Sequence, residues 1–453
     1  MENYYDVIVI GGGPSGIIAG TTAKKQYPEK SMLMIKENQR DLVPCGIPYI
    51  FHDLDDVTKD EMAPGAFKKA GGEVLIDRVV NVDVKTKSIK TKSGKEIKFH
   101  KLIFATGSKP LVPTFIKGYD LDGVKYIDKN FNKISELKEI TDSVSNIVVV
   151  GGGFIGVEVA EQLAKTGKNV SLIEMEEYCL LKAFSKDSAQ KADKLIKDSG
   201  INVFTGTQAK EIKGENGKVK SVLTNKQDEI PAELVIMSIG YVPNSELAKE
   251  AGLEINSQGA IRCDNYLKTS NEDIYAVGDC SQKLGFITGR TDNIMLASTA
   301  TAEARILGYN LYSIKLKRGF TGTLSVFSTE INNTVFASAG AIEQSAIDSC
   351  VDYVIGNFKA VDRHPGSLPD TKELSVKLIV SPEDGAIIGG ELCGGKSVGE
   401  MINIIGMAIQ KQVTVYELVS YQIGTHPLLT TAPTKYVLIK AAEAAIANIR
   451  KKK

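Results

Sequence analysis

Short apolar runs rich in β-branched residues recur along the chain and pass into glycine. The runs at 6–10 and 146–150 each lead into a glycine-rich segment and then into a helix-like stretch. Shorter runs within 102–110, 234–244 and 273–280 also end in a glycine turn. Because strands that feed glycine turns and helices are the units of doubly wound folds, the pattern predicts an α/β protein.

The last third of the chain follows a different pattern. Residues 373–381 (ELSVKLIVS) and 386–394 (AIIGGELCG) are expected to form strands, and residues 397–412 an amphipathic helix. A chain of 453 residues is too long for one hydrophobic core, so two or three domains are expected.

Composition and charge argue against several classes of partner. Lys+Arg and Asp+Glu balance at 55 each, and the only basic run is the terminal Arg450-Lys451-Lys452-Lys453. This balance predicts no nucleic-acid partner and no anionic membrane partner. No uncharged apolar run reaches about 18 residues, which argues against a spanning helix. The N-terminus lacks the basic region and cleavage site of a signal peptide.

The cysteines and histidines show no metal-binding or disulfide spacing. No C-x-x-C or C-x-x-x-x-C pair occurs among the six cysteines, which stand at positions 45, 179, 263, 280, 350 and 393. The four histidines likewise lack metal-ligand spacing. We therefore expect no metal, no disulfide framework and a reducing, cytoplasmic location.

Two segments carry the same glycine-rich motif, which is typical of phosphate-binding loops. The stretches DVIVIGGGPSGIIAG (6–20) and NIVVVGGGFIGVEVA (146–160) both place G-x-G-x-x-G between a strand and a helix. The first glycine allows a tight turn, the second lets backbone approach a pyrophosphate, and the third lets helix and strand pack closely. These glycines are Gly11, Gly13, Gly16 in the first copy and Gly151, Gly153, Gly156 in the second.

The two copies differ at the residue that follows the second strand, where a carboxylate is expected to bind the ribose hydroxyls. In the second copy, Glu174 follows the strand 23 residues past Gly151, and a carboxylate there accepts ribose hydroxyls and repels a 2′-phosphate. This favours NADH over NADPH. In the first copy the strand leads to Lys36 and then Glu37, so the acid is displaced by one residue and Glu37 is the candidate for the adenosine ribose.

One cysteine stands in an unusual setting. The segment RDLVPCGIPYI (40–50) places Cys45 between two prolines and beside a glycine, with no second cysteine nearby. If a helix begins at Cys45, its unpaired N–H groups lower the pKa of the thiol and favour a nucleophilic thiolate. The alternative is a small residue that only fills space at a strand–helix turn.

Taken in order, these motifs resemble the pyridine nucleotide–disulfide oxidoreductases, flavoproteins with two dinucleotide-binding domains. PCGIPY, with its lone cysteine, is similar to the single-cysteine branch of coenzyme A-disulfide and persulfide reductases, NADH oxidases and NADH peroxidases. The resemblance implies FAD at the first copy, NADH at the second, and a homodimer whose subunits share active sites. It implies an FAD domain of residues 1–120 and 245–320, interrupted by an NAD(P)H domain at 121–244, and an α+β dimerisation domain at 321–453.

The resemblance also implies cofactor contacts. Asp279 is expected at the ribityl chain of the flavin, Phe154 at the entrance of the nicotinamide pocket, and Glu158 at the nicotinamide amide. The remaining FAD candidates are Gly11, Gly13, Pro14, Ser15, Gly16, Glu37, Ala105, Thr106, Gly107, Gly278, Leu296 and Ala297. The remaining NADH candidates are Gly151, Gly153, Ile155, Gly156, Glu174 and Gly240.

By the same resemblance Cys45 faces the flavin as a redox cysteine, and without a partner it must form a mixed disulfide, a persulfide or a sulfenic acid. The substrate is then a low-molecular-weight disulfide, persulfide or polysulfide, with coenzyme A derivatives among the candidates. An NADH oxidase remains open, although Pro14-Ser15 occupies the place of the histidine found in peroxide-handling members. A reductase for a small redox protein, with Cys45 inert, and a non-catalytic NADH sensor also remain open.

Residues expected at the substrate are less well marked. His426-Pro427 resembles the C-terminal His-Pro of two-cysteine members, so His426 of the partner subunit is a candidate general acid. Tyr421 matches one of the two tyrosines of coenzyme A-disulfide reductases, and Arg363-His364 stands where the other belongs. The candidate substrate contacts are Lys24, Lys25, Lys69, His364 and Tyr421.

Overall fold

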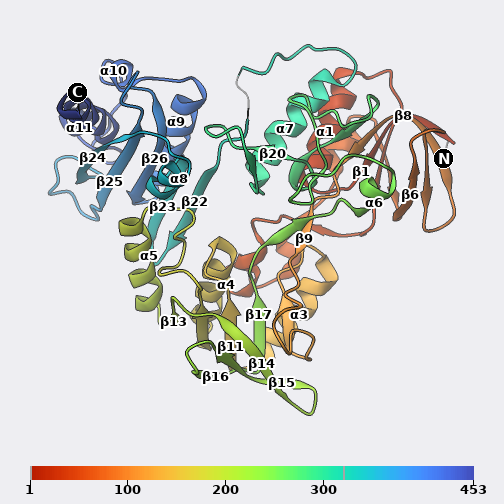
Figure 1. Cartoon of the computed structure of the whole chain (residues 1–453), viewed down its shortest axis with the longest axis horizontal. Coiled ribbons are helices and arrows are strands. Elements are labelled where there is room, and N and C mark those ends of the chain that lie inside the picture. Colours follow the sequence, from red (N-terminus) through yellow and green to blue (C-terminus); the bar gives the residue numbers. More distant parts are fainter. Residues whose placement is uncertain (1–2, 320–321, 453) are drawn as a thin grey trace.

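The computed structural model describes residues 3–319 and 322–452. Figure 1 shows three lobes: one built from both the N-terminal and the teal middle part of the chain, one from the yellow-green part, and one from the blue C-terminal part. No helix in these two described ranges combines the length and apolar character needed to cross a membrane.

The first lobe holds a sheet with seven described strands, in the order β5-β2-β1-β8-β7-β6, with β19 paired to β8. Its parallel strands are β1 (Tyr4–Ile10), β2 (Met32–Lys36), β5 (Glu73–Ile76), β8 (Glu96–Phe104) and β19 (Ile274–Ala276). Antiparallel strands β6 (Val79–Asp83) and β7 (Ser88–Thr91) extend one edge. Helices α1 (Pro14–Gln26) and α7 (Ala297–Asn310) pack together, so residues 274–310 return to complete this lobe.

The second lobe holds a parallel sheet in the order β10-β17-β11-β12-β13. Its elements are β10 (Val124–Tyr126), α3 (Phe131–Ser143), β11 (Asn146–Val150), α4 (Phe154–Lys165), β12 (Asn169–Ile173), α5 (Lys186–Asp198), β13 (Asn202–Phe204) and β17 (Leu234–Met237). A small antiparallel sheet of β14 (Ala209–Glu215), β15 (Lys218–Thr224) and β16 (Glu229–Pro231) adjoins it. Strands β9 (Ser108–Pro110) and β18 (Tyr241–Pro243) connect this lobe to the first.

The third lobe is an antiparallel sheet in the order β22-β23-β26-β25-β24, covered by helices. The strands predicted at 373–381 and 386–394 are confirmed as β25 (Glu373–Val380) and β26 (Ile387–Gly394), and the predicted helix as α9 (Val398–Gln410). The other main elements are β22 (Val326–Ile331), β23 (Thr334–Gly340), α8 (Glu343–Asp348), β24 (Val354–Val361), α10 (Val415–Leu418) and α11 (Val437–Lys452).

The apolar runs form strands because both faces of each parallel sheet are covered. In β1, Ile8 and Ile10 face one apolar cluster, whereas Val7 and Val9 face another on the opposite side of the sheet. All of these side chains are at most 6% exposed. A strand buried on both faces has no place for an alternating polar residue, which is why the run is continuous. The predicted α/β fold is confirmed.

The segment that carries the lone cysteine is held by an apolar cluster shared among the lobes. The short 3₁₀ helix η1 (Ile47–Phe51) buries Ile47, Ile50 and Phe51 in a cluster that also contains Val159 of α4 and Phe336 of β23. Each of these five side chains is at most 1% exposed. This packing fixes the cysteine segment relative to the second glycine motif.

A buried ion pair fixes the turn that follows β19. The Lys283 ammonium donates to the Gly278 carbonyl at 2.8 Å and pairs with Glu303 of α7 at 3.0 Å, and both side chains are at most 6% exposed. Glu303 also accepts from the Gly278 amide at 3.3 Å. The pair therefore joins the 278–279 turn to helix α7.

Replacing Lys283 with Met should leave the Glu303 carboxylate buried without its partner. Breaking a buried pair in this way costs about 3–5 kcal/mol, so the thermal unfolding midpoint should fall by several degrees. Lys220→Met removes a lysine whose pair with Glu215 is 64% exposed on both sides, and its midpoint should match that of the wild type. Circular dichroism melts of both variants measure the difference, and equal midpoints for the two would contradict this role of Lys283.

Candidate active site

The two glycine motifs adopt the same backbone geometry. Gly11 and Gly151 have φ of 115° and 110°, and a side chain at either would collide with a carbonyl oxygen of the neighbouring strand-end turn, Ala105 or Ser238. Such positive φ values are accessible to glycine and strained for other residues.

The second glycine of each motif faces open space. Among the described residues, no atom lies within 4 Å of a methyl group built on Gly13 or Gly153, the residues that precede α1 and α4. A phosphate can therefore approach the backbone and the free N–H groups of each helix N-terminus. Pro14 and Ser15 open α1, and Phe154 and Ile155 open α4. Both loops fit a dinucleotide pyrophosphate.

Strand-end turns border the first loop. The Ala105-Thr106-Gly107 turn follows β8, and the Thr106 hydroxyl donates to the Asn244 carbonyl at 2.5 Å. Gly107 and Gly240 have φ of 68° and 116°. Leu296 precedes helix α7, whose first residue is Ala297. These candidates therefore lie in turns that follow strands or at the start of α7.

The carboxylate of Asp279, beside the first glycine loop, is held by two donors. Its Oδ2 atom accepts from the Ser108 hydroxyl and from the Lys129 ammonium, both at 2.8 Å. Burial acts to raise the pKa of Asp279, but Lys129 and Ser108 outweigh it and hold the pKa below its ordinary value. Asp279 therefore remains ionised, beside the Gly278 turn.

The carboxylate of Glu174 lies against the second glycine loop, as the sequence predicts. Its Oε2 atom accepts from the Gly152 amide at 2.5 Å, and Oε1 accepts from the Glu176 amide at 2.8 Å. The side chain is 9% exposed. A negative charge fixed at the end of β12 is the arrangement that binds a ribose diol and repels a phosphate.

In the first copy the structure differs from the prediction for Glu37. The Glu37 side chain is 60% exposed, and its carboxylate lies 3.6 Å from Arg78. The nearest side chains to Gly12 are instead Lys36 and Asp41. The ribose contact of Glu37 therefore stays a prediction, and Asp41 is a second carboxylate near this loop.

Cys45 follows β3 (Asp41–Leu42) and precedes the five-residue 3₁₀ helix η1. The predicted α-helix N-terminus is therefore wrong, and so is the predicted lowering of the thiol pKa. Although the Cys45 side chain is exposed, the protein packed around it desolvates the thiolate and raises its pKa. The charges of Glu158, Asp279 and Asp60 act in the same direction, whereas Lys129 acts in the opposite direction. In the chain alone, the carboxylates outnumber the single lysine around the thiol.

Glu158 lies one turn into α4 and is close enough to act on the Cys45 charge. Burial raises its pKa to about 7, while the hydroxyl of Thr329, on β22, donates to it at 2.9 Å and acts to lower the pKa. Phe154, at the start of the same helix, stacks on Phe327 with ring centres 5.1 Å apart. The third lobe thus supports both residues proposed for the nicotinamide side.

Lys129 and Asp60 are missed by the sequence reading. Asp60 is 5% exposed, and burial raises its pKa to about 6. A side chain at Gly46 would collide with its carboxylate, which therefore lies directly against the cysteine segment. Lys129 occupies an unremarkable connection, and its partner Asp279 is 150 residues away. Neither residue belongs to a motif, so sequence spacing gives no signal for either.

The structure corrects one substrate candidate. The Lys24 ammonium donates to the carbonyls of Pro28 at 2.8 Å and Lys30 at 2.6 Å, and the side chain is buried at the end of α1. Lys24 therefore holds a turn and is not available for a substrate phosphate. Lys25 and Lys69 are exposed and remain predictions.

The C-terminal candidates lie together on the third lobe. His364 Nδ1 lies 3.0 Å from the Thr430 carbonyl oxygen, to which it donates, and its amide donates to the Pro427 carbonyl. His426 is exposed, and its Nδ1 atom accepts from the Leu428 amide at 3.2 Å. Tyr421 is 48% exposed on the same segment. An exposed segment carrying a histidine and a tyrosine suits a shared site between subunits, and these roles stay predictions.

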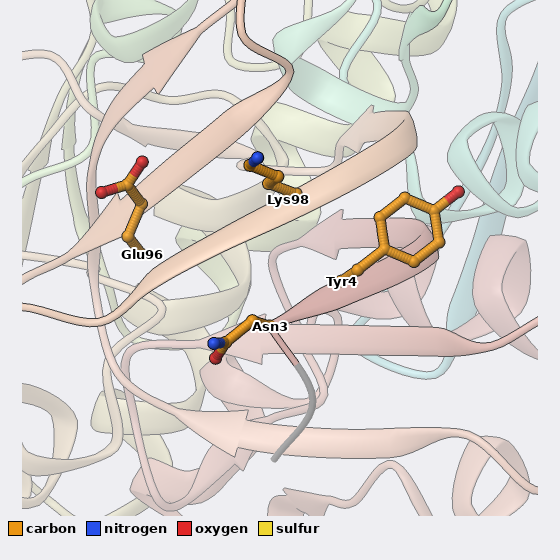
Figure 2. Close-up of a pocket in the computed structure, with 4 residues that line it drawn as sticks. All are labelled: Asn3, Tyr4, Glu96 and Lys98. Atoms are coloured by element: carbon orange, nitrogen blue, oxygen red, sulfur yellow. The ribbon is translucent and has the colours of Figure 1, made fainter.

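A shallow hollow elsewhere on the surface is not the site. Figure 2 shows it at the start of β1 and beside β8, lined by Asn3, Tyr4, Glu96 and Lys98. Ligands of parallel sheets bind at the carboxyl ends of the strands, where the glycine loops lie.

Comparison with known families covers most of the chain. The family model described as pyridine nucleotide-disulphide oxidoreductase matches residues 5–304. The model of that family's dimerisation domain matches residues 328–437.

Similar proteins carry two kinds of name. The chain is 31% identical to the NADH oxidase of Methanocaldococcus jannaschii, over 98% of this chain and 99% of that protein. It is 32% identical to the NAD(P)H coenzyme A polysulfide/persulfide reductase of Pyrococcus horikoshii, over 86% of this chain and 87% of that protein. The solved NAD-dependent persulfide reductase from A. fulgidus matches with a TM-score of 0.88 at 28% identity, covering 98% of this chain and 83% of that one.

The charges around Cys45 predict opposite effects of two substitutions. Asp60→Asn removes a negative charge and should lower the thiol pKa, so alkylation by iodoacetamide at pH 8 should accelerate by about threefold or more. Lys129→Met removes the positive charge and should slow the reaction. The rates are measured from pH 6 to 10 on the FAD-free protein, so that only the charges of the chain act.

Lys133→Met is the control for Lys129→Met, because Lys133 is 66% exposed and pairs with Asp128. Its alkylation profile should follow the wild type. A faster reaction in Lys129→Met, or a slower one in Asp60→Asn, would show that the assigned signs are wrong.

Glu174→Gln should weaken discrimination against NADPH, because the amide keeps the shape of the side chain without its charge. The ratio of kcat/KM for NADH to that for NADPH should fall by about tenfold or more. Glu177→Gln, which alters an exposed pair with Lys186, should leave the ratio unchanged. An unaltered ratio in Glu174→Gln would count against a role in nucleotide choice.

Proposed function

Because the chain belongs to the pyridine nucleotide-disulphide oxidoreductase family, we propose that it is an FAD-dependent NAD(P)H oxidoreductase that reduces a low-molecular-weight disulfide, persulfide or polysulfide through Cys45. The observation that carries this proposal is the position of Cys45. It lies on a segment packed against α4, within electrostatic reach of Glu158 of the second nucleotide motif and of Asp279 beside the first.

The chemistry at sulfur needs only one cysteine. The Cys45 thiolate attacks one sulfur of a substrate RSSR, which forms a Cys45–S–S–R bond and expels RS⁻. FAD, when bound, supplies the route by which the two electrons of NADH reach that bond. Cleavage returns the Cys45 thiolate and a second RS⁻, so NADH, one proton and RSSR give NAD⁺ and two RSH.

Residues of this chain manage the charge and the protons of these steps. Lys129 is the described cation that favours the Cys45 thiolate, and its pairing with Asp279 fixes its place. Glu158, with a pKa of about 7, changes its charge near neutral pH and would hold the nicotinamide amide of NADH. His426 of the partner subunit is proposed to protonate the departing thiolate.

The proposal includes several finer points. The match to a dimerisation domain supports a homodimer with shared sites. All six cysteines are free, which supports a cytoplasmic, reducing location. The exposed Lys25 and Lys69 would meet the phosphates of a coenzyme A derivative. Glu174 supports NADH as the preferred nucleotide.

A second candidate is an NADH oxidase in which Cys45 passes through a sulfenic acid. It is favoured by the whole-length similarity to the Methanocaldococcus jannaschii NADH oxidase. The first candidate is preferred because the dipeptide Pro14-Ser15 occupies the place of the histidine of the peroxide-handling members. It therefore offers no imidazole for the protons of peroxide.

Replacing Cys45 with Ser should abolish disulfide turnover while FAD binding and anaerobic flavin reduction by NADH persist, because only the sulfur nucleophile is removed. The activity should fall by about three orders of magnitude or more. Cys350→Ser, at the other exposed cysteine, should retain full activity.

The reduced proteins are then offered coenzyme A disulfide, polysulfide and O₂ separately, and flavin reoxidation is followed. Cys45-dependent reoxidation by a sulfur compound supports the first candidate. Reoxidation by O₂ alone, again dependent on Cys45, would favour the oxidase, and full disulfide turnover by Cys45→Ser would contradict both.

A further inference from the structure

The two glycine loops offer an internal comparison that points to the residue reading the adenosine ribose in the first copy. In both copies the first glycine donates its amide to the last apolar residue of the neighbouring strand. Gly11 bonds to the Ile35 carbonyl at 2.9 Å, and Gly151 to the Ile173 carbonyl at 2.8 Å. Lys36 therefore occupies the position that Glu174 occupies in the second copy.

Because Lys36 stands where the second copy has a glutamate, the carboxylate nearest to the first loop comes from Asp41 on another strand. A methyl group built on Gly152 would lie 2.9 Å from Glu174 Oε2, and one built on Gly12 would lie 3.3 Å from Asp41 Oδ2. The oxygens of Glu174 and Asp41 thus lie beside equivalent backbone positions, although Asp41 is on β3, five residues past the end of β2.

The surroundings of Asp41 fix its carboxylate. Its backbone pairs with Met62 of strand β4 (Glu61–Met62) and makes a bridge to Asn130. The Lys36 ammonium, which is 3% exposed, forms an ion pair with Asp41 Oδ2. Apart from that pair, the buried Oδ2 atom has no partner among the described residues. The side chains of Lys36 and Asn38 both act on the carboxylate, whose two oxygens keep lone pairs for further donors.

Glu37 does not meet these conditions. Its side chain is 60% exposed and lies near Arg78. Water already forms hydrogen bonds with an exposed carboxylate, so a ribose diol gains little free energy by binding there. An exposed side chain also offers the diol no fixed geometry.

We propose that Asp41, held by Lys36, accepts the hydroxyl groups of the adenosine ribose when FAD occupies the first glycine loop. The inference rests on FAD binding at that loop, which is part of the proposed function. Burial raises the pKa of Asp41, and the Lys36 ammonium acts in the opposite direction, favouring the charged carboxylate that accepts from the diol. The ribose site of the first copy thus consists of Asp41 and Lys36, whereas that of the second copy consists of Glu174.

The test compares FAD with its analogue that carries 2′-deoxyadenosine. Apo-protein is titrated with each dinucleotide, and the quenching of flavin fluorescence gives the dissociation constants. In Asp41→Asn, FAD should bind about tenfold to a hundredfold more weakly, and the preference for FAD over the deoxy analogue should disappear. Glu37→Gln makes the same chemical change on the neighbouring exposed acid and should keep the wild-type affinity and preference.

Asp41→Glu guards against a fold defect, because it keeps the charge and should retain the preference for the ribose hydroxyl. Loss of the preference in Glu37→Gln, wild-type binding by Asp41→Asn, or equal weakening of both dinucleotides by Asp41→Asn would overturn the proposal. Disulfide turnover by the wild-type holoenzyme is measured separately. Its absence would contradict the proposed function and leave the comparison of dinucleotides intact.

Discussion

The packing of the cysteine segment against helix α4 is the interaction on which the rest of the site depends. Ile47, Ile50 and Phe51 fill an apolar cluster together with side chains of α4 and of β23, and all of them are excluded from water. Burying each large apolar side chain is worth about 1.5–3 kcal/mol, so the segment has little freedom to move away. Because α4 begins at the second glycine motif, this contact fixes the position of the thiol relative to the second nucleotide loop.

The charges around the thiol follow from that packing. Three carboxylates and one lysine act on the charge of Cys45. Asp279 accepts a hydrogen bond from Lys129 and Glu158 accepts one from Thr329, whereas burial raises the pKa of Asp60. The net effect in the chain alone disfavours the thiolate. A site of this kind can control when the sulfur becomes reactive, since the balance responds to any added charge nearby.

Much of the fold could be predicted from the sequence because the signals are local. Continuous apolar runs mark strands buried on both faces, and the glycines at 11, 16, 151 and 156 stand where a side chain would collide with backbone. The lone cysteine and Glu174 were also found this way. Lys129, Asp60 and Asp41 were not, because each acts through a partner brought close only by tertiary folding. The sequence predicts the shift of the thiol pKa with the wrong sign, because the helix that follows Cys45 is a 3₁₀ helix of only five residues.

The return of β19 to the first sheet has a consequence for biosynthesis. All strands of the second sheet lie between residues 124 and 237, whereas the first sheet lacks β19 until residue 276 has been made, and α7 ends at residue 310. As the chain leaves the ribosome, the inserted lobe can complete its sheet before β19 is available to pair with β8 of the first sheet. Synthesis therefore supplies the whole inserted sheet before it supplies the last strand of the sheet that the N-terminal residues begin.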